Sequence, residues 1–197
     1  MGVEVAPLKP EEFDHAVGVL ARGMRDNPLH VAAFGDDPAA RVTKLTGMFT
    51  MVLGMQPDAL RADEDGTIVG TCGLGDNEPC TTGAFATVSR EEFPPVSDDP
   101  VEGDRVYEWV TAWAARDPEE RHLHLGPIAA DAGRQGQGIG TEMMKVFCSM
   151  ADRHGLLSYL ETDKAENVRF YEKFGFETVG EARVIGVPNW FMTRVPR

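Results

Sequence analysis

The sequence predicts an α/β fold in which a mixed, strongly twisted central sheet is flanked by helices. Segments with the period of a half-buried strand alternate along the chain with segments whose apolar residues recur at helical spacing. A glycine-rich loop joins one of these strands to an amphipathic helix. The 197 residues are enough for a full hydrophobic core, and no change in composition divides them. We therefore expect residues 1–197 to form a single domain.

The first half of the chain combines strand and helix patterns with one clear turn. Apolar and polar residues alternate in VEVAPL, and proline followed by two glutamates is a helix start. An Asp-Gly pair between two apolar runs is typical of a hairpin. The expected elements are a strand over residues 3–8, a helix from Pro10 that Asn27 and Pro28 end, a helix over about Pro38 to Leu53, and a hairpin over residues 59–74 turning at Asp65 and Gly66.

The second half opens with an irregular segment, residues 75–101, which is rich in Pro, Gly, Ser and Asp. Such loops are functional or mobile, so part of this one is expected either to border an acceptor site or to be a plain surface excursion. Regular patterns follow it. They predict a helix over Glu102 to Arg116, a strand over His122 to Ala130, a helix over Ile139 to His154, a strand over Leu157 to Thr162, a helix over Glu166 to Phe174, and strands over Glu177 to Ile185 and Trp190 to Val195.

The stretch RQGQGIGT, from Arg134 to Thr141, has the features of an anion-binding loop. Glycine lacks a Cβ, so three glycines at alternate positions allow backbone conformations closed to other residues and bring N–H groups close to a ligand. The following helix offers unpaired N–H groups and the positive end of its dipole to the same ligand. Phosphate is the usual ligand of such an arrangement.

The residues of this loop disfavour two common nucleotide-binding motifs. A Walker loop starting at Gly133 meets Ile139 where its lysine should stand, which argues against ATP. A dinucleotide fingerprint lacks its third glycine in either register, because Thr141 and Met143 stand at those positions. NAD and FAD are therefore disfavoured as well.

Gln135, Gly138 and Gly140 fit the pattern QxxGxG, and here the chain resembles the GNAT N-acetyltransferase superfamily. NVRFYEKFGFE, from residue 167 to 177, resembles the second motif of that family at the expected distance, after one helix and one strand. This motif followed by PNWFMTR is similar to the ending of the puromycin N-acetyltransferase-like branch. The resemblance covers roughly residues 120–195, whereas the first hundred residues match only in the order of their elements.

The resemblance implies the GNAT fold, acetyl-CoA as cofactor, and cofactor binding where two central strands diverge. By family position, the end of the strand before the loop pairs its backbone with the pantetheine arm, as an opened strand edge can. The loop and the helix start would bind the pyrophosphate through main-chain N–H groups. The implied cofactor-binding residues are Ile128, Ala129, Ala130, Gln135, Gly136, Gln137, Gly138, Ile139, Gly140, Thr141 and Asn167.

Two of the matched residues have a second interpretation. By family position, Tyr171 donates a proton to the departing sulfur, and a phenol with a pKa of about 10 can do so at neutral pH. The alternative is one more aromatic of a packed helix face, with its hydroxyl satisfied. Asn167 either contacts the cofactor near its sulfur or caps the helix that follows.

The general base is less clearly marked. Glu161 is the first candidate, because strand alternation puts it on the face opposite Leu160. His122 and His124 share one face of the preceding strand, which is the spacing of a metal pair. No third ligand is evident, so we expect no metal site and a pair of partly buried imidazoles. His124 is also a second candidate for the base or for a wall of the acceptor site.

The composition limits the partners and the cellular setting. A net charge of -13 argues against nucleic-acid and anionic-membrane surfaces, and it reflects either plain solubility or a cationic acceptor such as an amine. Cys72, Cys80 and Cys148 form no CxxC pair and have no His neighbour at metal spacing, so a reducing cytoplasm is the expected location. No apolar run reaches the length of about 18 residues that a membrane span needs.

We therefore predict an acetyl-CoA-dependent N-acetyltransferase acting on a primary amine of a small molecule. Direct attack is expected, since no Cys or Ser stands in a recognisable nucleophile setting. A non-catalytic acyl-CoA-binding sensor module and a protein N-terminal or lysine acetyltransferase remain alternatives. Glu108, Trp109 and Trp113 could line the acceptor pocket. The alternative for the two tryptophans is that they belong to the hydrophobic core. A homodimer is possible, with the strand over Trp190 to Val195 as a contact surface.

Overall fold

One mixed seven-stranded sheet forms the centre of the computed structural model, which describes residues 2–76, 80 and 82–197. The strands are β1 (Glu4–Pro7), β2 (Leu60–Glu64), β3 (Thr67–Gly75), β4 (His122–Ala130), β5 (Leu157–Thr162), β6 (Glu177–Val184) and β7 (Val187–Arg194). Their order in the sheet is β1-β2-β3-β4-β5-β7-β6. Only β4 and β5 are parallel, and the other neighbouring pairs are antiparallel.

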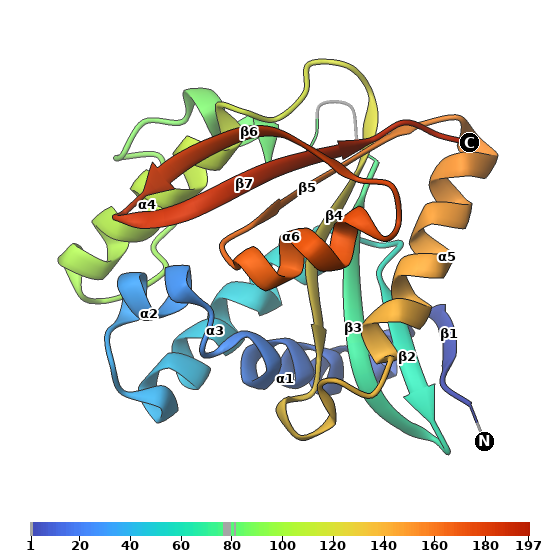
Figure 1. Ribbon diagram of the computed structural model, residues 1–197. Coiled ribbons are helices and arrows are strands. Elements are labelled where there is room, and N and C mark those ends of the chain that lie inside the picture. Colours follow the sequence, from blue (N-terminus) through green and yellow to red (C-terminus); the bar gives the residue numbers. More distant parts are fainter. Residues whose placement is uncertain (1, 77–79, 81) are drawn as a thin grey trace.

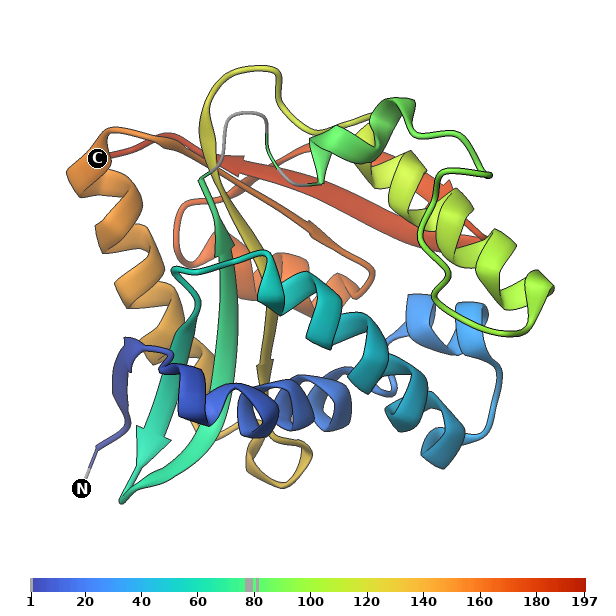
Figure 2. The ribbon, with the colours of Figure 1, turned by 180° about the vertical axis from the view of Figure 1, so that it is seen from behind.

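Helices cover both faces of this sheet (Figures 1 and 2). They are α1 (Phe13–Met24), α2 (Pro28–Phe34), α3 (Pro38–Gly54), α4 (Pro100–Ala114), α5 (Ile139–His154) and α6 (Ala165–Glu172), with short 3-10 turns η1 (Pro10–Glu12), η2 (Gly83–Thr87) and η3 (Ala132–Arg134). On one face α1, α3 and α4 bury Leu20, Leu45 and Trp109. On the other, α5 buries Met143 and Phe147 against the sheet. The predicted α/β architecture is therefore confirmed.

One helix, α2, was not predicted from the sequence. Asn27 leaves the helical conformation with a ψ of 139°, as its expected role in ending the first helix requires. Pro28 then takes the first position of a new helix. Its lack of an N–H costs no hydrogen bond there, because the first N–H groups of a helix have no intrahelical acceptor, and its fixed φ suits the first turn. The pair Asn27 and Pro28 therefore both ends one helix and begins another.

The two strands at the end of the chain, β6 and β7, form a hairpin. Ile185 and Gly186 both have positive φ, 42° and 82°, and connect the strands by a two-residue turn that suits their twist. For this reason β7 begins at Val187 rather than at Trp190. Because β7 is paired with β5 on one side and β6 on the other, it has no free edge. A homodimer contact through this strand would therefore have to use a face of the sheet, because β6 is the edge strand at this end of it.

The segment expected to be irregular is described at residues 75, 76, 80 and 82–101, and residues 77–79 and 81 lie outside the described part. Within it, η2 packs against α4. Phe93 lies in edge-on contact with Phe85 and with Tyr107 of α4, with ring centroids 5.7 and 5.4 Å apart. The segment is thus held against α4 by aromatic packing. Among the described residues, no helix is long and apolar enough to cross a membrane.

The two parallel strands at the centre of the sheet separate after a short stretch of pairing. β4 pairs with β5 only from His122 to His124, opposite Leu157 to Tyr159. Beyond His124, β4 continues to Ala130 and stays paired with β3. The expected divergence of two central strands is therefore present, and the β5-facing side of β4 has no ladder partner from Leu125 onward in the described part of the chain.

Candidate active site

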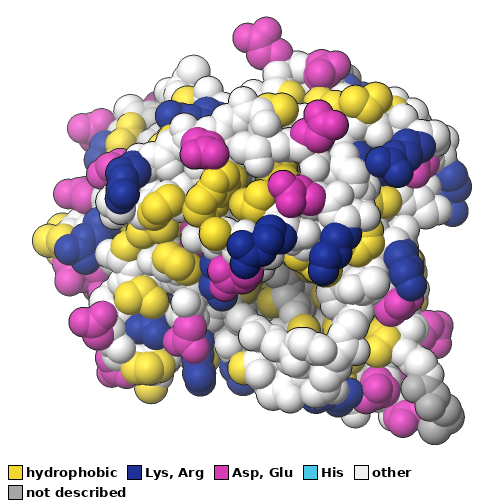
Figure 3. Space-filling view, in the orientation of Figure 1, with side chains coloured by type: hydrophobic (Ala, Val, Ile, Leu, Met, Phe, Trp, Pro, Cys, Tyr) yellow, Lys and Arg dark blue, Asp and Glu magenta, His cyan; other side chains and the backbone are white. Residues whose placement is uncertain are grey.

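A cavity lies where β4 and β5 diverge. Its volume is about 190 Å³. The residues that line it include Leu125 to Ile128 of β4, Glu161 and Thr162 of β5, and Asn167 and Tyr171 of α6. Figure 3 shows the surface hollowed next to α6, with hydrophobic side chains inside the hollow. Residues from the two diverging strands and the second sequence motif therefore meet at one place.

The glycine loop lies at the far end of β4 from the paired histidines. Gly136 and Gly138 have φ values of 76° and 86°, both left-handed, and a Cβ on either would meet only open space. Only glycine adopts this conformation without strain, which explains these two glycines. Gly140 lies inside α5 and its φ is not positive, so the third glycine has no such role.

The start of α5 fits an anion. Gly138 is the N-cap, no side chain caps the helix, and the first intrahelical bond runs from Glu142 N–H to Gly138 O. The N–H groups of Ile139, Gly140 and Thr141 therefore have no acceptor within the helix. Gln135 donates from Nε2 to the carbonyl of Gly23 at 2.8 Å, which ties the loop to α1, while Gln137 accepts from Arg134 Nε at 2.9 Å.

The three residues at the end of β4 have different surroundings. Ile128 lines the cavity. Ala129 is buried against α1, and a Cβ on Gly23 of that helix would lie only 2.3 Å from the Ala130 carbonyl oxygen. On one edge of β4, the backbones of all three residues pair with Gly70 to Cys72 of β3. Their β5-facing edge is the part of β4 that is left without a ladder partner.

Tyr171 is both packed and directed to the cavity. Its ring contacts Phe170 and Phe176, with centroids 5.3 and 6.0 Å away, and the side chain is buried. Its hydroxyl makes no hydrogen bond with any described residue, which does not match the alternative of a satisfied core tyrosine. Burial, with the nearby Cys72 and Asp163, raises the pKa of the phenol well above its usual value. At neutral pH the Tyr171 phenol is therefore protonated.

Asn167 is not a helix cap. The N-cap of α6 is Lys164, and Asn167 lies within the helix. Its Nδ2 donates to Thr162 Oγ1 at 3.2 Å, so α6 is linked to the end of β5 beside the cavity. This position excludes the capping alternative and leaves Asn167 as a cavity-lining polar side chain.

Glu161 lines the cavity and has one carboxylate oxygen without a hydrogen-bond partner among the described residues. Its Oε2 accepts from His124 Nε2 at 2.8 Å, and the side chain is only 3 % exposed. The other oxygen, Oε1, is buried and has no hydrogen-bond partner among the described residues. A buried carboxylate oxygen without a donor is unfavourable unless a ligand or water supplies one. Glu161 is therefore placed to accept a hydrogen bond from a molecule in the cavity, and His124 holds it in place.

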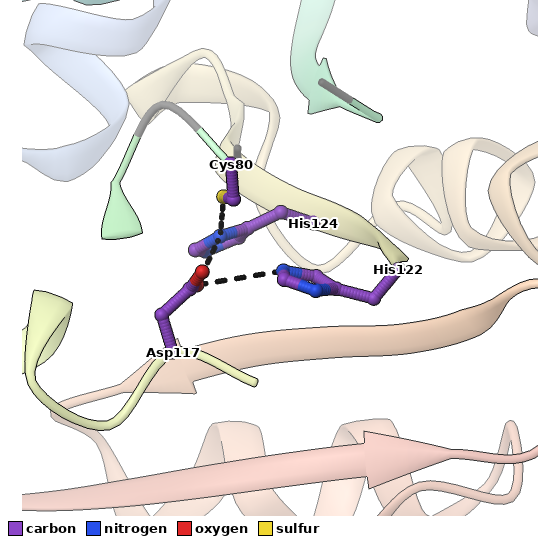
Figure 4. Close-up of side chains that lie close together, drawn as sticks. All are labelled: Cys80, Asp117, His122 and His124. Atoms are coloured by element: carbon purple, nitrogen blue, oxygen red, sulfur yellow. Dashed lines mark hydrogen bonds and ion pairs between the residues drawn. The ribbon is translucent and has the colours of Figure 1, made fainter. Parts of the chain in front are cut away.

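His122 and His124 face one another as predicted, with ring centroids 5.9 Å apart. The structure adds two neighbours that sequence spacing did not reveal, Cys80 and Asp117 (Figure 4). Burial raises the pKa of the Cys80 thiol, but hydrogen bonds with His122 and His124 outweigh it and lower the pKa to about 6. Burial likewise opposes the charged form of His122, and Asp117 and Cys80 together raise its pKa to about 9.

The remaining wall of the cavity is mostly aromatic and apolar. Trp109 and Trp113 of α4 line it in edge-on contact, 5.3 Å between centroids, so the pocket interpretation holds for both tryptophans although Trp109 is also part of the core. Glu108 is exposed and does not line it. Among the described lining residues the acidic side chains are Glu161 and Asp163, and no Lys or Arg is present.

Sequence reasoning missed several parts of this site. Phe85, Phe93 and Val96 line the cavity from the segment that showed no periodicity, and Phe49 and Met48 reach it from a helix that was interpreted only as packing. Asp117 directly follows the helix expected over Glu102 to Arg116, and the sequence indicated no role for it in the site. Composition was the signal that could have indicated these residues. Aromatic residues in an irregular, proline-rich segment are expected to pack against another part of the molecule.

Known proteins share this geometry at the level of the family and the fold. Residues 37–176 match the model of the Acetyltransferase (GNAT) family. An acetyltransferase of Corynebacterium glutamicum, described as histone acetyltransferase HPA2 and related acetyltransferase, superposes with a TM-score of 0.72 at 18% identity and covers 100% of this chain and 98% of its own.

Two insect enzymes have the same fold. The Drosophila melanogaster polyamine N-acetyltransferase that forms N-acetylagmatine has a TM-score of 0.68 at 14% identity, covering 98% of this chain and 100% of its own. Arylalkylamine N-acetyltransferase 2 of Aedes aegypti has a TM-score of 0.67 at 14% identity and covers 100% of both chains. At these identities the likeness shows a shared fold, a mixed seven-stranded sheet flanked by helices. Because the family model spans more than half of the residues, this chain belongs to the GNAT family of acetyltransferases.

Proposed function

We propose that this protein transfers the acetyl group of acetyl-CoA to the primary amine of a small molecule with an apolar, preferably aromatic, body. The observation that carries the proposal is the cavity that Glu161, Asn167 and Tyr171 line together, where one carboxylate oxygen of Glu161, Oε1, has no hydrogen-bond partner among the described residues. A carboxylate that can take a proton and a phenol that can give one are the two groups that amide formation from an ammonium and a thioester requires.

The chain has the features that acetyl-CoA binding calls for. Gly136 and Gly138 are exposed and left-handed, and the N–H groups of Ile139, Gly140 and Thr141 have no acceptor within the helix. Together with Gln135 and Gln137 in the turn, they would hold the pyrophosphate. The unpaired edge of β4 at Ile128 to Ala130 would pair with the pantetheine arm. Bound there, acetyl-CoA supplies an activated acetyl group and leaves as a thiol.

The residues around the cavity would divide the proton transfers between them. Glu161 Oε1 accepts a proton from the incoming ammonium, directly or through a water, and so frees the lone pair that forms the amide bond. Tyr171, whose pKa is raised by burial, donates its proton to the sulfur as the carbon–sulfur bond breaks. The second proton that the attacking nitrogen must lose then returns to the tyrosinate, so the phenol is restored. His124 holds Glu161 through Nε2. Asn167 orients the reactants beside the end of β5.

The shape and charge of the cavity favour one class of acceptor. Glu161 and Asp163 supply negative charge at the end near Tyr171, whereas Phe85, Trp109 and Trp113 supply an apolar wall. An aromatic wall also attracts cations through the faces of its rings. An amine with an aryl or alkyl body satisfies both ends. The two insect enzymes act on a polyamine and on arylalkylamines, and their likeness of fold agrees with the proposal.

Two alternatives remain testable. A non-catalytic acyl-CoA-binding sensor would keep the glycine loop but has no need for an unpartnered carboxylate beside a buried phenol. A protein N-terminal or lysine acetyltransferase would place a peptide in the cavity, and the C. glutamicum protein of the same fold carries the description of a histone acetyltransferase. The end of the chain is similar to the puromycin N-acetyltransferase-like branch, so an aminonucleoside is a further candidate for the acceptor substrate.

The proposal is tested by following free thiol while the protein turns over acetyl-CoA with a panel of amines. The panel contains 2-phenylethylamine, agmatine, puromycin and short peptides with a free N-terminus or lysine. We expect the highest kcat/KM with 2-phenylethylamine. Tight binding of acetyl-CoA without turnover of any amine would instead identify a sensor module, and preference for the peptides would identify a protein acetyltransferase.

Substitution of Tyr171 tests the chemistry. Tyr171→Phe should lower kcat by about 100-fold, the size of a lost general acid, with the affinity for acetyl-CoA unchanged. Tyr107→Phe is the matched control, because the Tyr107 hydroxyl donates to Val88 O outside the cavity. Glu161→Gln should lower kcat by a similar factor. Wild-type turnover in Tyr171→Phe would rule out the assigned acid.

A further inference from the structure

We propose that Cys80, Asp117, His122 and His124 form a closed, four-ligand zinc site that fastens the segment after β3 to β4. Their candidate ligand atoms are one sulfur, one carboxylate oxygen and two ring nitrogens, which all lie within 4.8 Å of one another. Figure 4 shows the four side chains pointing toward a common centre from three places in the chain: Cys80 after β3, Asp117 after α4, and the two histidines on β4.

The spacing of these atoms matches a tetrahedron around zinc. Bond lengths near 2.1 Å to nitrogen and oxygen and 2.3 Å to sulfur put neighbouring ligand atoms about 3.3 to 3.6 Å apart. The Cys80 Sγ to His124 Nδ1 distance is 3.2 Å. Asp117 Oδ1 lies 3.2 Å from His124 Nδ1 and 3.4 Å from His122 Nε2. The two edges from Asp117 Oδ1 are close to those of such a tetrahedron, and the edge from Sγ to Nδ1 is about 0.4 Å shorter than in a zinc site, so binding of an ion requires only a small movement of these side chains.

The hydrogen bonds around the cluster hold both rings in the orientation that a metal needs. His124 Nε2 lies 2.8 Å from Glu161 Oε2, and His122 Nδ1 lies 2.8 Å from the carbonyl of Glu120. Both partners are acceptors, so the proton of each neutral ring sits on the outward nitrogen. The inward nitrogens, Nδ1 of His124 and Nε2 of His122, then carry lone pairs. Metal-bound histidines in proteins are oriented in this way by outer acceptors.

Hydrogen bonds alone do not satisfy the inward atoms. Asp117 Oδ1 and His122 Nε2 are buried and have no hydrogen-bond partner among the described residues, although they lie only 3.4 Å apart. Both side chains are nearly inaccessible, 5 % exposed for Asp117 and 2 % for His122. Two buried lone-pair atoms this close to one another require a cation between them, which is either a proton on His122 or a metal ion. A zinc ion would satisfy both, together with Cys80 and His124.

The donor set also indicates which ion fits. A thiolate and two imidazoles select zinc over magnesium or calcium, which prefer oxygen ligands. The two negative charges of Cys80 and Asp117 neutralise a divalent ion, so the buried site carries no net charge. With four protein ligands no position is left open for water. The site is therefore structural rather than catalytic.

The local backbone is adapted to this arrangement. The Ala84 N–H donates to the Cys80 carbonyl at 2.9 Å, so the chain turns directly after Cys80. A Cβ on Gly83 would lie 2.6 Å from Asp117 Oδ2, so only glycine allows the loop to approach this closely. The prediction of no metal site from the sequence depended on the lack of a third ligand, and Cys80 and Asp117 supply a third and a fourth from 42 and 5 residues before His122.

The consequence of the site reaches the cavity. His124 is at once a ligand and the donor to Glu161, and Thr82 and Phe85, which follow Cys80, line the cavity. An ion bound here would fix the wall that carries Glu161. This role rests on the four ligands alone and holds whichever acceptor the enzyme uses.

Metal analysis of the full chain tests the proposal. Protein produced in zinc-supplemented medium should carry about one equivalent of zinc. Cys80→Ser and Asp117→Asn should each lose at least tenfold in zinc affinity, whereas Cys148→Ser should retain the ion, because Cys148 lies on α5 outside the cluster. Binding of acetyl-CoA to each variant confirms that it is folded.

Wild-type protein provides a second readout that needs no variant. After chelation, titration with cobalt should give the intense visible bands of a tetrahedral site and a thiolate-to-cobalt charge-transfer band. Chelation should also lower Tm and expose Cys80 to alkylation. Two outcomes would overturn the proposal: no zinc in the purified protein together with no cobalt spectrum, or full retention of zinc in both Cys80→Ser and Asp117→Asn. The four side chains would then be an ion-pair cluster without a metal.

Discussion

Glu161 and Arg194 show how differently a buried charged side chain can be used in this molecule. Glu161 lines the cavity and keeps one buried oxygen without a partner among the described residues. Arg194, 4 % exposed, uses its whole guanidinium: Nη1 and Nη2 each donate to Asp152 at 2.8 Å, and Nε donates to the carbonyl of Phe174 at 3.0 Å. The satisfied group is expected to stabilise the fold, and the unsatisfied one to serve the chemistry.

We expect Arg194→Gln to lower the free energy of unfolding by about 2 kcal/mol at pH 7, because it leaves Asp152 and the Phe174 carbonyl without charged donors. The hydrogen bond from Arg194 lowers the pKa of Asp152. A lowered carboxyl pKa contributes stability above the unfolded value of about 3.9 and loses it as the pH falls further. Urea unfolding should therefore show a smaller difference between wild type and variant at pH 3.

Arg183→Gln is the control for this measurement. Arg183 is exposed and donates only to the carbonyl of Gly186 among the described residues, so its loss should change the free energy of unfolding by less than about 0.5 kcal/mol. Equal losses in the two arginine variants would contradict the role given to Arg194.

At the scale of elements, the loop before α5 and the start of that helix act as one unit. Gly138→Ala places a Cβ at a φ of 86°, a strain of about 1 to 2 kcal/mol that the loop can relieve only by moving its N–H groups. We expect the KM for acetyl-CoA to rise by about tenfold with the amine KM unchanged. Isothermal titration with acetyl-CoA measures the effect directly.

Gly133→Ala controls for the loss of a glycine in the same region. A Cβ on Gly133 meets open space, and its φ is not positive. It should bind acetyl-CoA like wild type. An unchanged affinity in Gly138→Ala would remove the loop from the cofactor site.

The helix α4 contributes the aromatic wall of the cavity. Trp113→Ala should lower kcat/KM for 2-phenylethylamine by about tenfold, since part of a buried aromatic surface is lost, and should affect methylamine little. Trp190→Ala, on β7 outside the cavity lining, is the comparison variant. Steady-state kinetics with both amines separates a lost apolar contact from a general loss of activity. A general loss would lower kcat/KM for 2-phenylethylamine and for methylamine together.

At the scale of the whole molecule, a net charge of -13 should attract cationic acceptors. The value of kcat/KM for a monocationic amine should therefore fall as salt is raised, because screening shortens the reach of the field. Binding of acetyl-CoA, which is anionic, should weaken less or strengthen. Kinetics from low to high potassium chloride tests this. A parallel fall for both substrates would point to a general salt effect on the enzyme.

Much of the fold could be predicted from the sequence because its signals are local. The Asp65 and Gly66 turn, the helix after the glycine loop and the alternation of the central strands all depend on periods of two or 3.6 residues and on turn chemistry. The errors were also local in origin. Pro28 was interpreted only as the end of one helix, but it also begins the next. The turn at Ile185 was missed because it lacks the usual Asn or Asp.

The candidate site could be predicted only in part. Gln135, Gly138, Asn167 and Tyr171 stand at fixed spacings, so a motif can indicate them from the order of residues alone. The partners of Glu161 could not be predicted in this way. His124 lies 37 residues earlier in the chain and reaches Glu161 because β4 and β5 are parallel neighbours.

The sequence by itself determined the family resemblance and indicated the glycine loop and Tyr171 as candidates for cofactor binding and proton donation, since the motifs occupy neighbouring positions along one strand, one loop and two helices. Only the tertiary structure decided what surrounds them: the aromatic wall from α4 and the irregular segment, the free oxygen of Glu161, and the meeting of Cys80 and Asp117 with the two histidines. The contacts of His124 with Glu161 and Cys80 join residues 37 and 44 positions apart, and their geometry is set by sheet pairing and packing, which leave no periodic signal in the chain.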